Sequence, residues 1–155
     1  MNLFAVHMQG FTPETWPVVS FRSRIVCERL LNDFQSGDRI LYVGIIEAND
    51  PIESRKLIGL AEINGGPIVT TQDVVNPKCI DKGCFNSGGS FKWPFGIQIS
   101  RAWLFPKKFL PDAKSRIGNQ YSNAPRGDYY RVDDDKVDAI MNLRQTEVTE
   151  FYQPT

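Results

Sequence analysis

The sequence predicts one α+β domain built on a small curved mixed β-sheet, or partial barrel, flanked by helices. Two β-prone apolar runs, 39–46 and 56–63, supply the middle of the sheet. Two segments with apolar residues at helical spacing, 20–34 and 133–143, supply the flanking helices. A length of 155 residues suits one hydrophobic core and is short for two.

The first half of the chain alternates between strand, loop and helix. Residues 3–8 mix β-branched and aromatic side chains, and they predict a short first strand. Residues 11–17 carry two prolines and are too broken for regular structure. The helix over 20–34 follows, with Ser20 as its candidate N-cap and Gly37 just past its end.

The sheet is expected to form from the next segments. The run 39–46 is almost wholly apolar and predicts a central strand, and 56–63 is expected to pair with it antiparallel. Residues 68–90 predict a long, mobile surface excursion with at most one short strand or helical turn. Alternating apolar residues over 91–105 then predict a long strand.

The last third is less regular before the closing helix. Residues 109–130 are rich in Pro, Gly, Asn and Ser and are expected to be irregular. We expect the domain to cover 1–145 and residues 146–155 to form a C-terminal extension. Within it, Val148 and Phe151 either form a last strand or pack as a frayed end.

The overall charge excludes a general attraction to polyanions. Lys and Arg together number 18, as do Asp and Glu, so a nucleic-acid or lipid partner has to be met by a local patch. Residues 92–116 are enriched in basic side chains, and these are candidate phosphate-binding residues. They are Lys92, Arg101, Lys107, Lys108, Lys114 and Arg116. An ordinary solvated face is the alternative interpretation of this enrichment.

Localisation and metal content follow from the termini and the cysteines. The opening residues lack the features of a signal peptide, and no apolar run reaches the length of a membrane span, so we expect a soluble cytoplasmic protein without a membrane partner. Three cysteines do not make a disulfide framework. Cys79 and Cys84 have spacing close to that of zinc ligands, but only Cys27 and His7 remain to complete four ligands. We therefore expect no metal and no cofactor.

Two predicted strands contain sequence motifs that are similar to those of a known superfamily. The segments Ser36-Gly37-Asp38-Arg39-Ile40-Leu41-Tyr42 and Ile58-Gly59-Leu60-Ala61-Glu62-Ile63, in this order and spacing, resemble the PUA-like superfamily, in particular its EVE and ASCH branches, which are related to YTH readers. The resemblance covers roughly residues 1–145. It implies a curved sheet or partial barrel whose aromatic pocket holds a base, and therefore a nucleic-acid-binding module that recognises a modified or flipped base.

A base pocket needs flat apolar faces and a few directional polar groups. The candidate base-binding residues are Trp16, Ser20, Phe21, Arg22, Tyr42, Gly44, Trp93 and Trp103. Trp16 and Trp93 stand out because each precedes a proline in a segment that joins regular elements, where a large ring often lines a rim or lid. The alternative is that the rings fill a core, and Trp103 is the first candidate for that place.

The sequence favours a binding module over an enzyme. It contains no Ser-His-Asp arrangement, Cys-His pair or phosphate-binding glycine loop. Resemblance to ASCH-type hydrolases keeps one enzymatic alternative open, a nucleoside or RNA hydrolase using Lys92, Glu62 and Thr70 or Thr71. A third alternative is an accessory domain that contacts a partner protein through 68–90, and an effector carried on another chain remains a possible partner.

Overall fold

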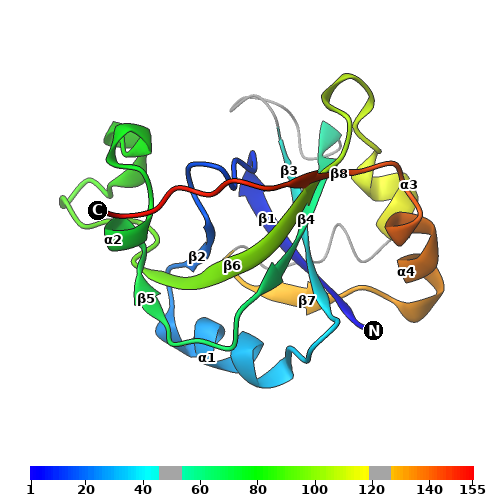
Figure 1. Cartoon of the computed structure of the whole chain (residues 1–155), viewed down its shortest axis with the longest axis horizontal. Coiled ribbons are helices and arrows are strands. Elements are labelled where there is room, and N and C mark those ends of the chain that lie inside the picture. Colours follow the sequence, from blue (N-terminus) through cyan, green and yellow to red (C-terminus); the bar gives the residue numbers. More distant parts are fainter. Residues whose placement is uncertain (46–53, 119–126) are drawn as a thin grey trace.

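The computed structural model describes residues 1–45, 54–118 and 127–155 and shows a mixed α+β fold around a curled, half-barrel sheet (Figure 1). Hydrogen-bonded neighbours follow the order β2-β6-β4-β3-β1-β7, and β5 and β8 also pair with β6. The strands are β1 (Leu3–Gln9), β2 (Val18–Phe21), β3 (Arg39–Ile45), β4 (Lys56–Ile63), β5 (Val69–Thr70), β6 (Phe95–Leu104), β7 (Tyr129–Arg131) and β8 (Thr146–Val148). The helices are α1 (Arg24–Asp33), α2 (Thr71–Val74), α3 (Ala113–Ile117) and α4 (Asp134–Met141), with 3-10 turns η2 (Pro77–Cys79), η3 (Lys82–Cys84) and η4 (Lys107–Phe109).

The centre of the sheet matches the sequence prediction. β3 lies between β4, its antiparallel partner, and β1, its parallel partner. The parallel pair is possible because β2 and α1 provide the crossover that two parallel neighbours require. The predicted central strand, the antiparallel β3–β4 pair, the long strand at β6 and the closing helix at α4 are therefore confirmed.

The predicted start of the first helix is wrong. Ser20 is not an N-cap, because residues 18–21 form β2 and pair with β6. The helix begins at Arg24, with Ser23 in the N-cap position and no capping hydrogen bond from its side chain. The physical reason is burial: Val19 and Phe21 alternate into the barrel interior, and this tertiary pairing outweighs the helical spacing that continues upstream.

Two hydrophobic clusters lie on the two faces of the sheet. Along β1, Phe4 and Val6 join the cluster inside the curl, whereas Leu3 and Ala5 join the cluster on the outer face. α1 contributes to the inner cluster, and α3 and α4 contribute to the outer one. The alternation of a strand with a period of two produces this division.

The segments predicted as irregular hold more structure than expected. The excursion at 68–90 contains β5, α2, η2 and η3, because Asn76 and Asp81 each accept a hydrogen bond from a backbone N–H two residues ahead and stabilise the 3-10 turns. Within the described part of 109–130, α3 forms and β7 begins at Tyr129. Local side-chain capping and pairing with β1 therefore order segments whose composition is typical of loops.

The C-terminal residues belong to the sheet at first and then cross the molecule. Val148 lies in β8, which pairs with β6, so it forms the predicted last strand. Phe151 lies beyond this strand and packs against the inner cluster. The tail then runs toward α2, where the backbone N–H of Tyr152 donates to Glu14 (Figure 1). In the described ranges, no helix has the length and apolar character required to cross a membrane.

Candidate functional site

The aromatic residues Trp16 and Trp93, far apart in the sequence, meet at one end of β6. Their rings lie edge to face, with centroids 6.4 Å apart and planes at 80°. Phe91 joins them, nearly parallel to Trp16 at 6.2 Å and perpendicular to Trp93 at 6.2 Å. Both indoles are only partly buried, so the cluster presents aromatic surface to solvent. We call these three rings with Phe85, which packs edge-on against Phe91 at 5.6 Å, the aromatic cluster.

A buried hydroxyl group fixes the orientation of Trp16. The indole Nε1–H of Trp16 donates to Oγ of Ser20 at 2.9 Å, and the hydroxyl of Thr71 donates to the same oxygen at 3.4 Å. Ser20 and Thr71 are both buried. Because a hydroxyl oxygen accepts two hydrogen bonds, Ser20 joins the Trp16 loop, β2 and α2 at one atom.

The backbone of the Trp16 loop is held from three sides. Its residues accept hydrogen bonds from the N–H groups of Asn76 in the excursion, Ile99 on β6 and Tyr152 in the C-terminal tail. The Trp16 N–H itself closes a turn on Thr12 at 2.9 Å. A ring on a loop held this way is preorganised, so little conformational entropy would be lost when it contacts a ligand.

The second half of the cluster comes from a short hairpin-like loop. Phe85 and Phe91 form an isolated antiparallel bridge, and Lys92 donates its N–H to the carbonyl of Cys84 at 2.8 Å. Phe91 and Trp93 lie two residues apart on either side of a bend at Lys92, and their rings contact each other. That spacing is the signal that predicts Phe91 as a cluster member, whereas Phe85 has no comparable signal.

The rings pack too closely for a base to enter between them. A heterocycle sandwiched between two parallel rings needs about 7 Å between their planes, twice the usual carbon contact distance of roughly 3.5 Å. Trp16 and Phe91 have centroids only 6.2 Å apart. A flat ligand would therefore stack on the outward surface of the cluster, which makes it a platform.

Tyr42 does not lie in the aromatic cluster. It is almost wholly buried inside the curled sheet and stacks on Phe11, with centroids 3.7 Å apart and planes at 12°. The absence of a side chain at Gly59 allows this, since a Cβ there would come within 2.7 Å of the Phe11 ring. The Tyr42 hydroxyl has no hydrogen-bond partner among the described residues, and burial raises the pKa of this phenol.

Three other predicted base-binding residues are also separate from the cluster. Phe21 is buried in the inner hydrophobic cluster. A Cβ at Gly44 would lie 1.8 Å from the carbonyl oxygen of Met8, so this glycine permits close approach of β1 and β3. Trp103 is 7% exposed and belongs to the outer cluster, which confirms it as a core residue.

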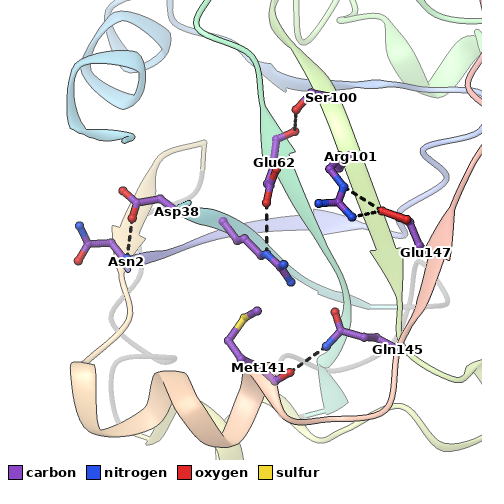
Figure 2. Close-up of polar contacts among 9 residues, drawn as sticks. Asn2, Asp38, Glu62, Ser100, Arg101, Met141, Gln145 and Glu147 are labelled. Carbon is purple, nitrogen blue, oxygen red and sulfur yellow. Dashed lines mark hydrogen bonds and ion pairs between the residues drawn. The ribbon is translucent and has the colours of Figure 1, made fainter. Parts of the chain in front are cut away.

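The predicted basic patch is divided by the fold. Lys92 lies at the aromatic cluster, with its Nζ 5.9 Å from the Trp93 ring centroid, and Arg22 is exposed directly after β2. Arg101 instead lies over the ring of Trp103, 4.8 Å from its centroid. It also pairs with Glu147 on β8 (Figure 2). The other four cations lie beyond the far end of β6, on or beside η4 and α3; they are Lys107, Lys108, Lys114 and Arg116.

The residues of the hydrolase alternative are engaged elsewhere. Glu62 lies 3.7 Å from Arg39 in an ion pair, and its backbone carbonyl accepts from Ser100 (Figure 2). Thr71 is buried against Ser20, and Lys92 lies over Trp93. Across the parts of the chain that the structure describes, no group of His, Cys, Asp and Glu side chains has the arrangement of a metal site.

A hollow of about 490 Å³ lies at the edge of the sheet beside β7. Its polar side chains are paired with one another or with close neighbours: Arg29 with Asp128, and the Tyr129 hydroxyl with Asp33 at 2.5 Å. The Arg29 guanidinium also lies 5.2 Å from the Tyr129 ring centroid. These groups stabilise one another, so the aromatic cluster is the better candidate for recognition.

His7 occupies a polar cluster on the outer face of β1. Its Nε2 lies 2.9 Å from the hydroxyl of Tyr130, and Arg55 approaches its Nδ1. Burial, and then the positive charge of Arg55, lower the pKa of His7 to about 4. The imidazole is therefore neutral at physiological pH.

Comparison with known proteins gives no relative from which to infer a function. No protein-family model matches the sequence, and no curated protein matches it significantly. The function has to be argued from the geometry of the site.

Proposed function

We propose that this protein is a nucleic-acid-binding module of the PUA-like type that holds an exposed base, modified or flipped, on the aromatic cluster. The observation that carries the proposal is the contact between Trp16 and Trp93, both partly exposed, with Trp16 held in place by the buried Ser20 hydroxyl. Two partly exposed indoles in contact form an apolar surface patch, and patches of this kind are typical of ligand-binding sites.

The chemistry of the cluster suits a nucleobase. Indole faces stack on any heterocyclic base, and each such contact contributes on the order of 1–3 kcal/mol. Lys92 lies against Trp93, and Arg22 projects into solvent close to the same end of β6, so both cations are available for the phosphates that flank a stacked base. A platform with two adjacent cations fits a single strand or a flipped nucleotide better than an intact duplex.

The test is binding of short oligonucleotides, unmodified and modified, by Trp93→Ala and wild type. Trp93→Ala should weaken binding fivefold to about a hundredfold, because one stacking face is lost. The matched control is Trp103→Phe, which changes a buried tryptophan on the outer face of the sheet and should leave affinity unchanged. Equal affinity of Trp93→Ala and wild type, with both proteins folded by circular dichroism, contradicts the proposal.

Fluorescence gives an independent reading of the same site. The chain has three tryptophans, of which Trp103 is buried and Trp16 and Trp93 are partly exposed. A base that stacks on the cluster should reduce the tryptophan emission by the same absolute amount in Trp103→Phe as in wild type. Quenching that disappears in Trp103→Phe would locate the ligand elsewhere.

A further inference from the structure

An exposed phenylalanine stands on a turn at the other end of β6. Phe109 closes η4 and is 83% exposed, the highest value among the large apolar side chains of the described residues. In Figure 1 this turn projects from the body of the molecule at the end of β6 opposite β5 and α2. A ring with this exposure is accessible to a ligand.

The turn is surrounded by positively charged side chains that form no ion pair with any residue in the described ranges. The four cations of this region, all exposed, are Lys107, Lys108, Lys114 and Arg116. Among the described residues, the acid next to this turn is Asp112, which accepts the Ser115 N–H at 2.9 Å and lies 3.8 Å from Lys56. The acidic first turn of α4 lies beyond α3 as seen from the turn (Figure 1).

We propose that η4 and α3 form a second contact for the same nucleic-acid strand that the aromatic cluster binds, an inference that rests on the proposed function. Phe109 stacks on a base, and the four cations contact phosphates on either side of it. An aromatic ring among unpaired cations is the arrangement that sequence-independent single-strand binding uses.

The fold sets the length of strand that reaches both contacts. β6 has 10 residues, so nine steps of about 3.3 Å place its ends at most about 30 Å apart along the curved strand. A stacked strand advances roughly 3.4 Å per nucleotide, so about ten nucleotides span this distance. A short oligonucleotide therefore occupies one contact only, and a long one occupies both.

Charge and apolar area favour a nucleic acid over a lipid surface at this turn. Stable membrane anchoring requires a broad apolar face or a second anchoring signal besides cations. Here Phe109 is one ring, its neighbour Leu110 is partly buried, and the other strongly exposed apolar side chain of the described helices, Ile25, lies on α1. A single ring among cations can stack on a base without needing a wider apolar surface.

The experiment measures binding of oligonucleotides of about four and about twenty nucleotides to Phe109→Ala and to Trp93→Ala. Phe109→Ala should weaken binding of the long oligonucleotide fivefold to about a hundredfold and leave the short one unchanged. Trp93→Ala should weaken both. The matched control is Ile25→Ala, which removes a similarly exposed apolar side chain and should change neither.

The two proposals fail in different ways. If Trp93→Ala loses affinity but Phe109→Ala binds the long oligonucleotide as wild type does, the second contact is refuted and the aromatic cluster stands. If Trp93→Ala binds both lengths normally, the proposed function itself is refuted. Binding of the wild type to vesicles containing phosphatidylserine, lost in Phe109→Ala while oligonucleotide binding is unchanged, would replace the second contact with a lipid surface.

Salt dependence gives a further measure of the same contact. Lys107→Ala combined with Lys108→Ala should reduce the slope of log affinity against log salt by about 1.4, since each phosphate contact of a single strand contributes roughly 0.7. The reduction should appear with the long oligonucleotide only. An unchanged slope would show that these lysines do not contact phosphates.

Discussion

Tyr42→Phe should stabilise the domain, although most substitutions in a core destabilise it. Tyr42 is 1% exposed, and its hydroxyl has no hydrogen-bond partner among the described residues. Leaving such a group buried and unpaired costs about 1–3 kcal/mol. Removing one oxygen atom leaves a small void, which costs well under 1 kcal/mol at roughly 24 cal/mol per Å³. The net gain in the free energy of unfolding is therefore on the order of 1 kcal/mol.

The assay is thermal and urea unfolding of Tyr42→Phe beside Tyr129→Phe. For a chain of this size, 1 kcal/mol corresponds to about 2–4 °C in Tm, so Tyr42→Phe should melt a few degrees above wild type. Tyr129 is the matched control, because its hydroxyl donates to Asp33 at 2.5 Å, and losing that bond should lower the Tm. A lower Tm for Tyr42→Phe would show that its hydroxyl is hydrogen-bonded in the folded protein, which refutes the reasoning.

Three further perturbations have defined outcomes. His7, the chain's one histidine, has its pKa lowered to about 4. Its contribution to the free energy of unfolding should therefore be complete above pH 6.5 and decline by about 3 kcal/mol in total as the pH falls toward 4. NMR titration of His7, and urea unfolding of wild type against His7→Gln, check this. Cys79 is exposed whereas burial raises the pKa of Cys27 to about 11, so Ellman's reagent should modify Cys79 in the native protein and Cys27 only after unfolding. Gly44→Ala should unfold the domain or lower its Tm by many degrees in a thermal scan, because its Cβ would overlap the Met8 carbonyl at 1.8 Å, and a Tm near that of wild type would contradict the close β1–β3 approach.

The sequence predicted the parts of the fold that are governed by local pattern. The apolar runs of β3 and β4 and the alternation of β6 carry their structure in their own periodicity, and each was found where expected. β2 escaped prediction because only four residues form it and its pairing partner lies more than seventy residues away. Strands that short depend on tertiary pairing, which local periodicity does not encode.

The site was predictable in the same uneven way. Trp16 and Trp93 were singled out by the prolines that follow them, and the structure brings them together. Tyr42 and Trp103 were grouped with them by chemistry alone. The sheet places Tyr42 in the inner hydrophobic cluster and Trp103 in the outer one, and both are separate from the aromatic cluster. Aromatic character identifies candidates for stacking, but only the direction of each strand decides which rings meet.

Two members of the aromatic cluster, Phe85 and Phe91, were not among the predicted base-binding residues. Phe85 belongs to the excursion whose composition suggested an irregular loop, and it meets Phe91, at the start of the predicted long strand, through an isolated bridge. The cations were equally misleading, because Lys92 lies before one end of β6, Arg101 lies within the strand, and the other four basic residues lie beyond its other end. An extended chain separates neighbours in sequence by about 3.3 Å per residue, so a charge-rich segment does not by itself make a charge-rich surface.

β6 hydrogen-bonds to β2, β4, β5 and β8, and the segments that carry the aromatic cluster and the exposed Phe109 adjoin its two ends. A strand with so many partners opens only when much of the sheet opens with it, so its amides should be among the last to exchange with deuterium. The distance between the two ends is thereby as rigid as the sheet itself. Ligands bound at the two ends would therefore be held at a fixed spacing. Inserting or deleting a residue within β6 would turn the following side chains of the strand to the opposite face.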